Sequence, residues 1–191
     1  IEQLSSLRAM PNTVVIRPAD PTETAQAWIA ALRNTTGPTA ILVTRQNLEP
    51  LDRSIYPAPE MLEKGAYTLC DTKPGEQPDA IIIATGSEVQ LALKAIEQLK
   101  EVGKSIRVVN MPSWELFEKQ SPEYQESVLP KACTKRIAIE AGASFGWERY
   151  IGIDGLAITI DHFGASAPYK VLEQKLGFTP EAVVEKIKKY L

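Results

Sequence analysis

Three polar side chains stand where an apolar segment ends, in the stretch "TAILVTRQNL" at 39–48. The apolar part is typical of a buried strand, and ligands of open α/β sheets gather at the carboxyl ends of such strands. Arg45 is the candidate among the three, because its planar guanidinium can donate two hydrogen bonds to the oxygens of one phosphate. The residues by themselves allow two interpretations, an anion-binding site or a solvated loop.

A second pattern, "GASFG" at 142–146, is the Gly-x-Ser-x-Gly motif that places a serine nucleophile between a strand and a helix. Ser144, Asp154 and His162 follow one another in the order of an α/β-hydrolase triad. Only one predicted strand separates Asp154 from His162, however, and no glycine motif for an oxyanion hole precedes the serine. A tight turn after a strand is the favoured interpretation, and a serine hydrolase is the alternative.

A third segment, "IATGSE" at 83–88, predicts a strand that ends in glycine at the start of a helix. Free backbone N–H groups at such a place can bind a phosphate. The complete Walker A and Gly-x-Gly-x-x-Gly patterns are absent, and Ser87 is explained as a helix N-cap. Glu88 in the first turn suits the helix dipole and disfavours an anion. The segment therefore predicts an ordinary helix start.

Composition narrows the class of protein. The chain has 191 residues, of which 44% are hydrophobic, and this favours a folded globular protein. Its 21 basic and 24 acidic residues give a net charge of -3 without a basic stripe, which argues against nucleic acid and anionic membranes as partners. No apolar run reaches the length of a membrane span. Cys70 and Cys133 lie far apart and fit reduced thiols of a cytoplasmic protein.

The elements that must position these residues form two groups. In the first group, a strand at 13–20, a helix at 22–34 and a strand at 39–44 form a βαβ unit, which implies parallel pairing. Thr22 is a plausible N-cap of the helix. One face of that helix is apolar and consists of Ala25, Trp28, Ile29 and Leu32. A helix is predicted to begin at Ile1, before the βαβ unit, and no N-cap residue precedes it. This indicates that the chain is a piece of a longer one.

The second group follows a proline-rich connector at 49–65. Strands alternate with helices and turns from there to the end, and the last helix has Thr179 as N-cap and Pro180 at its first position. Residues 66–191 are therefore expected to form a three-layer αβα domain with a mainly parallel sheet, and 1–48 a partial βαβ piece of a second α/β domain. The predicted strands of the complete domain are 66–70, 80–86, 105–112, 135–142 and 156–161.

Long motifs in a fixed order resemble the transketolase family over the whole chain. "PTAILVTRQNL" is similar to the family's "SRQNL" segment, and "SLRAMPNTVVIRPAD" is similar to the strand and turn before it. "GAYTL", "IIIATGSEV", "RVVNMPSWELFEKQ", "ESVLPKA", "EAG" and "FGASAP...LGFTPEAVVEKIK" follow in the family's order and spacing. The "RQNL" and "FGASAP" motifs favour transketolase over related thiamine enzymes, such as a 2-oxoacid dehydrogenase β subunit or a deoxyxylulose-phosphate synthase.

The resemblance implies that 1–48 is the end of the pyrimidine-binding domain, 49–65 a linker and 66–191 the C-terminal domain. The family transfers a two-carbon ketol unit from a ketose phosphate to an aldose phosphate, as a cytoplasmic homodimer with thiamine diphosphate and Mg2+. Arg45 corresponds to the arginine that binds the sugar phosphate, with Thr44 in place of the commoner serine. The catalytic, cofactor-binding and metal-binding residues of the family would precede Ile1. We therefore expect no bound cofactor and no activity from this chain alone, which could also act as an interaction module.

Overall fold

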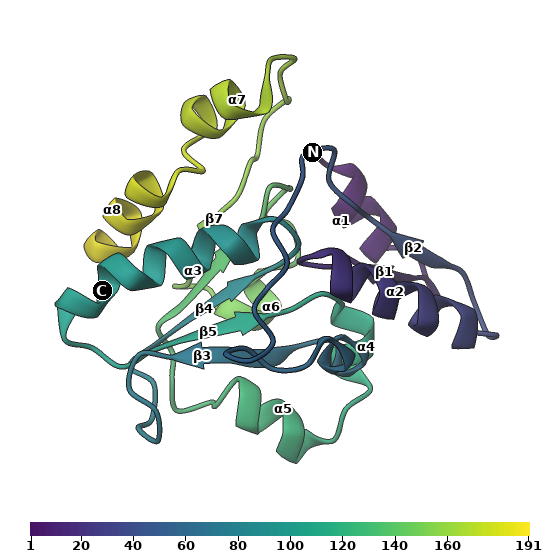
Figure 1. Cartoon of the computed structure of the whole chain (residues 1–191), viewed down its shortest axis with the longest axis horizontal. Coiled ribbons are helices and arrows are strands. Elements are labelled where there is room, and N and C mark those ends of the chain that lie inside the picture. Colours follow the sequence, from purple (N-terminus) through teal and green to yellow (C-terminus); the bar gives the residue numbers. More distant parts are fainter.

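The computed structural model describes all residues from Ile1 to Leu191 and contains two sheets of unequal size (Figure 1). Four strands of the larger sheet are parallel to one another. Only the edge strand β3 is antiparallel, and it pairs with β5. The predicted mainly parallel sheet is confirmed. Its order is β3-β5-β4-β6-β7, formed by β3 (Tyr67–Asp71), β4 (Ala80–Ala84), β5 (Ile106–Asn110), β6 (Arg136–Ile139) and β7 (Leu156–Ile158).

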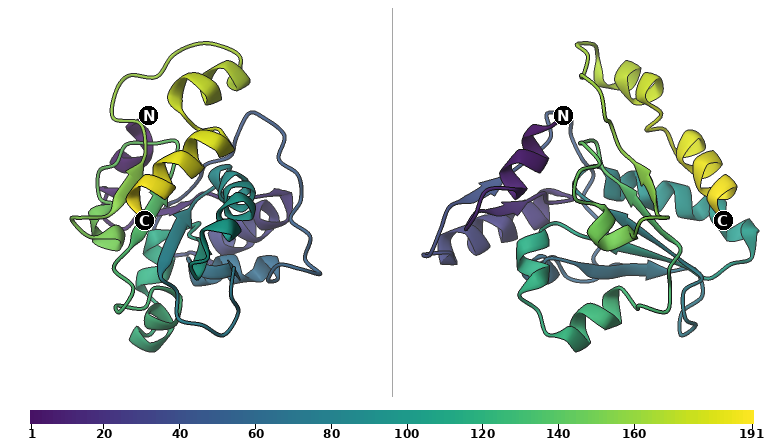
Figure 2. Two further views of the ribbon diagram at one scale, coloured as in Figure 1. Left: turned by 90° about the vertical axis from the view of Figure 1, so that its left-hand side faces the viewer. Right: turned by 180° about the vertical axis from the view of Figure 1, so that it is seen from behind.

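Helices cover both faces of this sheet, as seen from two further sides in Figure 2. Ile82 of β4 packs with α3 (Glu88–Leu99) and α8 (Pro180–Tyr190). Ile81 and Ile83, one residue to either side, pack in a second cluster on the opposite face. Because successive side chains of a strand point to opposite faces, a strand buried on both sides is apolar throughout. The second face is covered by α4 (Trp114–Glu118), α5 (Pro122–Val128) and α6 (Glu148–Ile151).

The smaller sheet belongs to the N-terminal unit, in which β1 and β2 pair in parallel. The predicted βαβ order is confirmed, although both strands are shorter than expected. After β1 the N–H of Arg17 donates to the carbonyl of Pro112 instead of to β2, and Pro18 has no N–H to donate. The elements of the unit are α1 (Gln3–Arg8), β1 (Val14–Ile16), α2 (Pro21–Arg33) and β2 (Thr39–Ile41).

The observed N-caps of two helices differ from the predicted ones. Asp20 caps α2, accepting the N–H of Glu23 at 2.7 Å, whereas Thr22 lies inside the first turn. Ser87 makes no capping bond to α3: its backbone is already helical, and its hydroxyl donates to the Glu88 carboxylate at 2.7 Å. Thr179, by contrast, accepts from the N–H of Ala182 at the start of α8, as predicted.

The apolar face of α2 is exposed. Trp28 is 60% and Leu32 78% exposed, while the buried residues of this helix are Glu23 and Ala27. A two-stranded sheet offers too little surface to cover both the core face and this second face. In Figure 1 the outer side of α2 has no further element against it.

The connection between the two sheets is largely irregular and includes only the 3-10 helix η1 (Pro59–Lys64). Near the other end of the chain, α7 (Tyr169–Leu176) has no buried residue and stands away from the five-stranded sheet (Figures 1 and 2). The two cysteines are unpaired. None of the helices combines the length and the apolar character that a membrane crossing requires.

Candidate functional site

Arg45 lies on an exposed loop that leaves β2. The sheet continues for one more bond past Ile41, from the N–H of Leu42 to the carbonyl of Ile16 at 2.9 Å. Thr44 then donates to the carbonyl of Gln46 at 2.9 Å, which closes a short turn with Arg45 at its tip. The guanidinium takes part in none of the ion pairs of the chain. It is therefore available to an anion from outside.

Cavities flank this loop on both sides. One, of about 560 Å³, lies at the carboxyl ends of β1 and β2 and is lined by Asp20 together with residues of the loop. The other, of about 500 Å³, lies between the loop, α3 and α7. Gln46, Asn47 and Leu48 line both cavities. The loop thus separates the two cavities, and it lies at the carboxyl ends of the strands, where open α/β sheets bind ligands.

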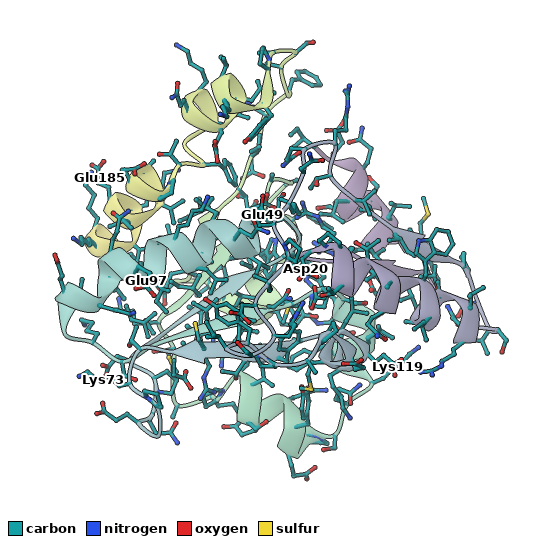
Figure 3. All side chains as sticks on the ribbon, in the orientation of Figure 1. Asp20, Glu49, Lys73, Glu97, Lys119 and Glu185 are labelled. Carbon is teal, nitrogen blue, oxygen red and sulfur yellow. The ribbon has the colours of Figure 1, made fainter.

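A short segment after the loop is fastened to the body of the molecule. Gln90 of α3 donates to the carbonyl of Glu49 at 2.6 Å. The carboxylate of Asp20 accepts the N–H of Leu51 at 2.8 Å and the guanidinium of Arg53 at 2.9 Å. Figure 3 shows Asp20 in the middle of the molecule, between α2 and the larger sheet, with Glu49 above it. The N-terminal unit and the larger domain are joined at this point.

A buried charged cluster lies beside this junction, around Glu140. Arg8 donates two hydrogen bonds of 2.8 Å to the Glu140 carboxylate, and Arg17 forms an ion pair with it at 3.4 Å. Thr85 donates at 2.6 Å and the indole of Trp147 at 2.9 Å. Burial alone would raise the pKa of Glu140, but the two guanidiniums and the hydroxyl outweigh it and lower the pKa to about 2. Glu140 is therefore charged at every physiological pH.

A second buried carboxylate, Glu23, has different partners. Its oxygens accept from the hydroxyl of Tyr67 at 2.5 Å, the amide of Asn110 at 2.9 Å and the N–H of Ala19 at 2.8 Å. All three donors are neutral. Burial raises the pKa of Glu23, and the hydrogen bonds and the charge of Arg53 oppose this without cancelling it.

The residues of the hydrolase alternative are not brought together. Ser144 follows β6 and Asp154 precedes β7. Because these two strands are parallel, Ser144 lies at the carboxyl ends of the strands and Asp154 at their amino ends. The N–H of Ser144 donates to Asp161 at 2.7 Å. His162 is exposed, with Nδ1 2.8 Å from the carbonyl oxygen of Phe163. The serine hydrolase interpretation is wrong, because a triad needs its three side chains within hydrogen-bonding reach.

The "IATGSE" segment also has a structural explanation. Gly86 adopts a positive φ of 54°, and a Cβ there would lie 3.0 Å from Cζ of Arg17. Arg17 donates to the Glu88 carboxylate at 2.9 Å. The glycine thus makes room for a buried arginine, and the helix start is occupied by protein groups. This agrees with the prediction that the segment is not a phosphate site.

The sequence interpretation did not find the buried cluster, although a signal was present. Arg17, Thr85 and Glu140 each directly follow an apolar strand, as the loop of Arg45 does. Polar residues at the carboxyl ends of strands from both sheets could therefore have been predicted to meet. Arg8 carries no comparable signal, since it ends a short helix near the start of the chain.

The molecule is thus an α/β protein whose two sheets meet at the carboxyl ends of their parallel strands, with a free arginine at the rim. Comparison with known proteins gives its family. The family "Transketolase-like TK C-terminal domain" matches residues 65–179, and "Transketolase, pyrimidine binding domain" matches residues 1–50. The chain belongs to the transketolase family.

Similar proteins agree over the whole chain. It is 53% identical to a transketolase of Aquifex aeolicus over 187 residues, which cover 98% of this chain and 27% of that protein. A transketolase of Geobacillus stearothermophilus is 51% identical, with 100% and 28% covered. Among solved structures, transketolase from Leishmania mexicana has a TM-score of 0.87 at 41% identity, covering 100% of this chain and 27% of the other. A transketolase of Pichia stipitis in complex with sedoheptulose 7-phosphate has a TM-score of 0.89 at 38% identity, with the same coverage. The chain spans little more than a quarter of the length of these relatives.

Proposed function

We propose that this chain is part of a transketolase, an enzyme that transfers a two-carbon ketol unit from a ketose phosphate to an aldose phosphate. Residues 1–48 are the end of its pyrimidine-binding domain, 49–65 a linker and 66–191 its C-terminal domain. The family membership and the identity over the whole chain support this proposal. The exposed face of α2 is explained in the same way, since the remainder of a pyrimidine-binding domain would cover Trp28 and Leu32.

Within this enzyme, Arg45 binds the phosphate of the sugar substrate. The observation that carries the proposal is the exposed, unpaired guanidinium on a loop at the carboxyl end of β2, beside a cavity. The similar Pichia stipitis enzyme binds sedoheptulose 7-phosphate, a sugar phosphate. An arginine at this place supplies a charge-assisted, bidentate contact, which distinguishes phosphorylated from unphosphorylated sugars.

The complete enzyme uses thiamine diphosphate and a divalent cation, usually Mg2+, and acts as a cytoplasmic homodimer. No group of three or more His, Cys, Asp or Glu side chains in this chain could hold a metal ion. We therefore assign neither a metal ligand nor a catalytic step to the residues of this chain. The role proposed for this chain is to bind the substrate phosphate and to support the fold and the assembly of the dimer.

The test is a substitution of Arg45 in the complete transketolase that carries this chain. A charge-assisted hydrogen bond contributes about 1.5–3 kcal/mol, so Arg45→Ala should raise the KM for a ketose phosphate roughly 10- to 150-fold. The KM for an unphosphorylated ketose should stay within about twofold of the wild-type value, since that substrate makes no phosphate contact. Arg45→Lys keeps the charge without the planar fork and should fall between the two.

Arg33→Ala is the matched control, because Arg33 is an exposed arginine of the same N-terminal unit that pairs with Glu63. It should leave both KM values unchanged. If Arg45→Ala raised the KM for phosphorylated and unphosphorylated substrates equally, the phosphate role would be refuted.

A further inference from the structure

The segment Glu49–Arg53 directly continues the loop of Arg45, and its fastening limits where that loop can lie. On the other side the loop is tied to the sheet through Leu42, whose N–H donates to Ile16. The chain is next held at Glu49, by Gln90, and at Leu51, by Asp20. Arg45 therefore lies between two fixed points that are only nine residues apart in sequence, Leu42 and Leu51. A loop closed over so short a distance samples far fewer conformations than one with a free end.

Asp20 makes two contacts with the segment whereas Gln90 makes one, and its two carboxylate oxygens have separate partners. Oδ1 accepts the N–H of Glu23 at 2.7 Å and the hydroxyl of Thr22 at 2.8 Å, which starts α2. Oδ2 accepts the N–H of Leu51 at 2.8 Å and the guanidinium of Arg53 at 2.9 Å. The Asp20 side chain is fully buried, so both of the bonds to the segment are shielded from water. A helix cap alone needs only the first oxygen.

The position of Asp20 relative to the proposed phosphate site gives the second oxygen a function. Asp20 lines the cavity at the carboxyl ends of β1 and β2 together with Thr44 and Gln46, the neighbours of Arg45 on either side. The buried carboxylate of Asp20 thus holds the segment that follows Arg45, next to the cavity that the neighbours of Arg45 line. If the segment were released, binding of the substrate would also have to order the loop, which weakens affinity.

We infer that Asp20, through Oδ2, is a positioning residue that sets the place of Arg45 for the substrate phosphate. This inference rests on the phosphate role of Arg45 proposed above. Asp20 touches no substrate atom in this scheme. Its removal should therefore raise the KM for phosphorylated substrates, while kcat and the handling of unphosphorylated ones stay unchanged.

The sharpest variant is Asp20→Asn in the complete transketolase. Asparagine is as good an N-cap as aspartate, so its oxygen can keep the start of α2. Its amide nitrogen would then face the N–H of Leu51 and the guanidinium of Arg53, two donors that it cannot accept from. We expect the KM for a ketose phosphate to rise about three- to tenfold, with kcat and the KM for an unphosphorylated ketose within about twofold.

Two measurements separate this positioning effect from a loss of structure. Hydrogen exchange of the backbone amides from Thr44 to Leu51 should become faster in Asp20→Asn, while that of the five-stranded sheet stays slow. In an Arg45→Ala background, Asp20→Asn should add nothing to the KM for the ketose phosphate, because its effect passes through Arg45. A folded Asp20→Asn enzyme with unchanged exchange in the loop, or with equal rises for both substrate kinds, would overturn the inference.

Arg53→Gln provides a second route if Asp20→Asn does not fold. Arg53 is partly exposed and its loss leaves the cap of α2 intact, but it removes one of the two contacts of Oδ2. We expect a two- to fivefold selective rise of the KM for the ketose phosphate. Arg33→Gln, an exposed arginine paired away from the loop, is the control for the loss of a positive charge and should show no rise.

The outcomes also distinguish this inference from the proposed function. Without a phosphate-selective effect of Arg45→Ala, the proposed function fails, and the inference fails with it. A selective effect of Arg45→Ala together with none for Asp20→Asn and Arg53→Gln overturns the positioning role alone.

Discussion

Two buried carboxylates at the junction between the N-terminal unit and the larger domain solve the same physical problem in opposite ways. Glu140 and Glu23 are both fully buried. Glu140 meets two guanidiniums, and its pKa is lowered to about 2. Glu23 meets a hydroxyl, an amide and a backbone N–H, and its pKa is raised. Burial penalises the charge at both places, so the partners decide which form is stable.

The difference shows how one junction can contain two buried carboxylates whose protonation affects stability in opposite directions. The Glu140 cluster joins Arg8 and Arg17 of the N-terminal unit to the ends of β4 and β6 by ion pairs. The Glu23 cluster joins α2 to β3 and β5 by hydrogen bonds that a protonated carboxyl partly retains. Buried ion pairs become costly when one partner is lost, whereas neutral networks lose one bond at a time.

The largest effect is expected from Glu140→Gln. The substitution keeps the size of the side chain but leaves the buried Arg8 without its carboxylate partner, while Arg17 keeps its ion pair with Glu88. Breaking a buried ion pair in this way costs about 3–5 kcal/mol of unfolding free energy. Urea denaturation of the 191-residue chain measures it. Glu97→Gln is the control, because Glu97 forms an exposed pair with Lys100; a loss no greater than the control's would mean that Glu140 is not the centre of a charged junction.

The pH dependence of stability should differ in sign between the two carboxylates. For Glu140 the folded state binds its proton only near pH 2, whereas the unfolded chain binds it near the ordinary value of 4.5. Its contribution, on the order of 3 kcal/mol, is therefore present above pH 4.5 and is lost as the pH falls toward 2. For Glu23 the raised pKa gives stability that is present below 4.5 and is lost as the pH rises through the folded-state value.

Unfolding free energies at a series of pH values check both signs. Glu140→Gln should flatten the fall in stability below pH 4.5, and Glu23→Gln should flatten the decline above it. If each variant merely shifts the whole profile and leaves its slopes intact, neither carboxylate has the partner-determined pKa assigned to it.

The sequence predicted the fold better than the junction, for a physical reason. The run "AIIIA" of β4 and the cap and proline at Thr179 and Pro180 act through neighbours in sequence, so their patterns are visible in the chain. The role of Asp20 at the junction could not be predicted from the sequence, because its bonds to Leu51 and Arg53 reach across more than thirty residues. The exposure of the apolar face of α2 could not be predicted either, because an apolar stripe on a helix does not indicate which element covers it. Arg45 was predicted as a site residue because ligands of open α/β sheets gather at the carboxyl ends of the strands, and its phosphate role stays a prediction.

The smallest effect is expected from Tyr67→Phe, which removes one neutral donor from the Glu23 cluster. Phenylalanine fills the same buried space, and Asn110 and the N–H of Ala19 still donate to the carboxylate. The loss should be about 1 kcal/mol at neutral pH, the usual value of a single buried hydrogen bond. Because the Tyr67 hydroxyl opposes the upward shift, its removal should also raise the pKa of Glu23 further. Tyr169→Phe, at an exposed tyrosine of α7 far from the Glu23 cluster, should show neither change in the same denaturation series. A loss in Tyr67→Phe as large as that of Glu140→Gln would show that the neutral network holds the junction as strongly as the ion pairs do.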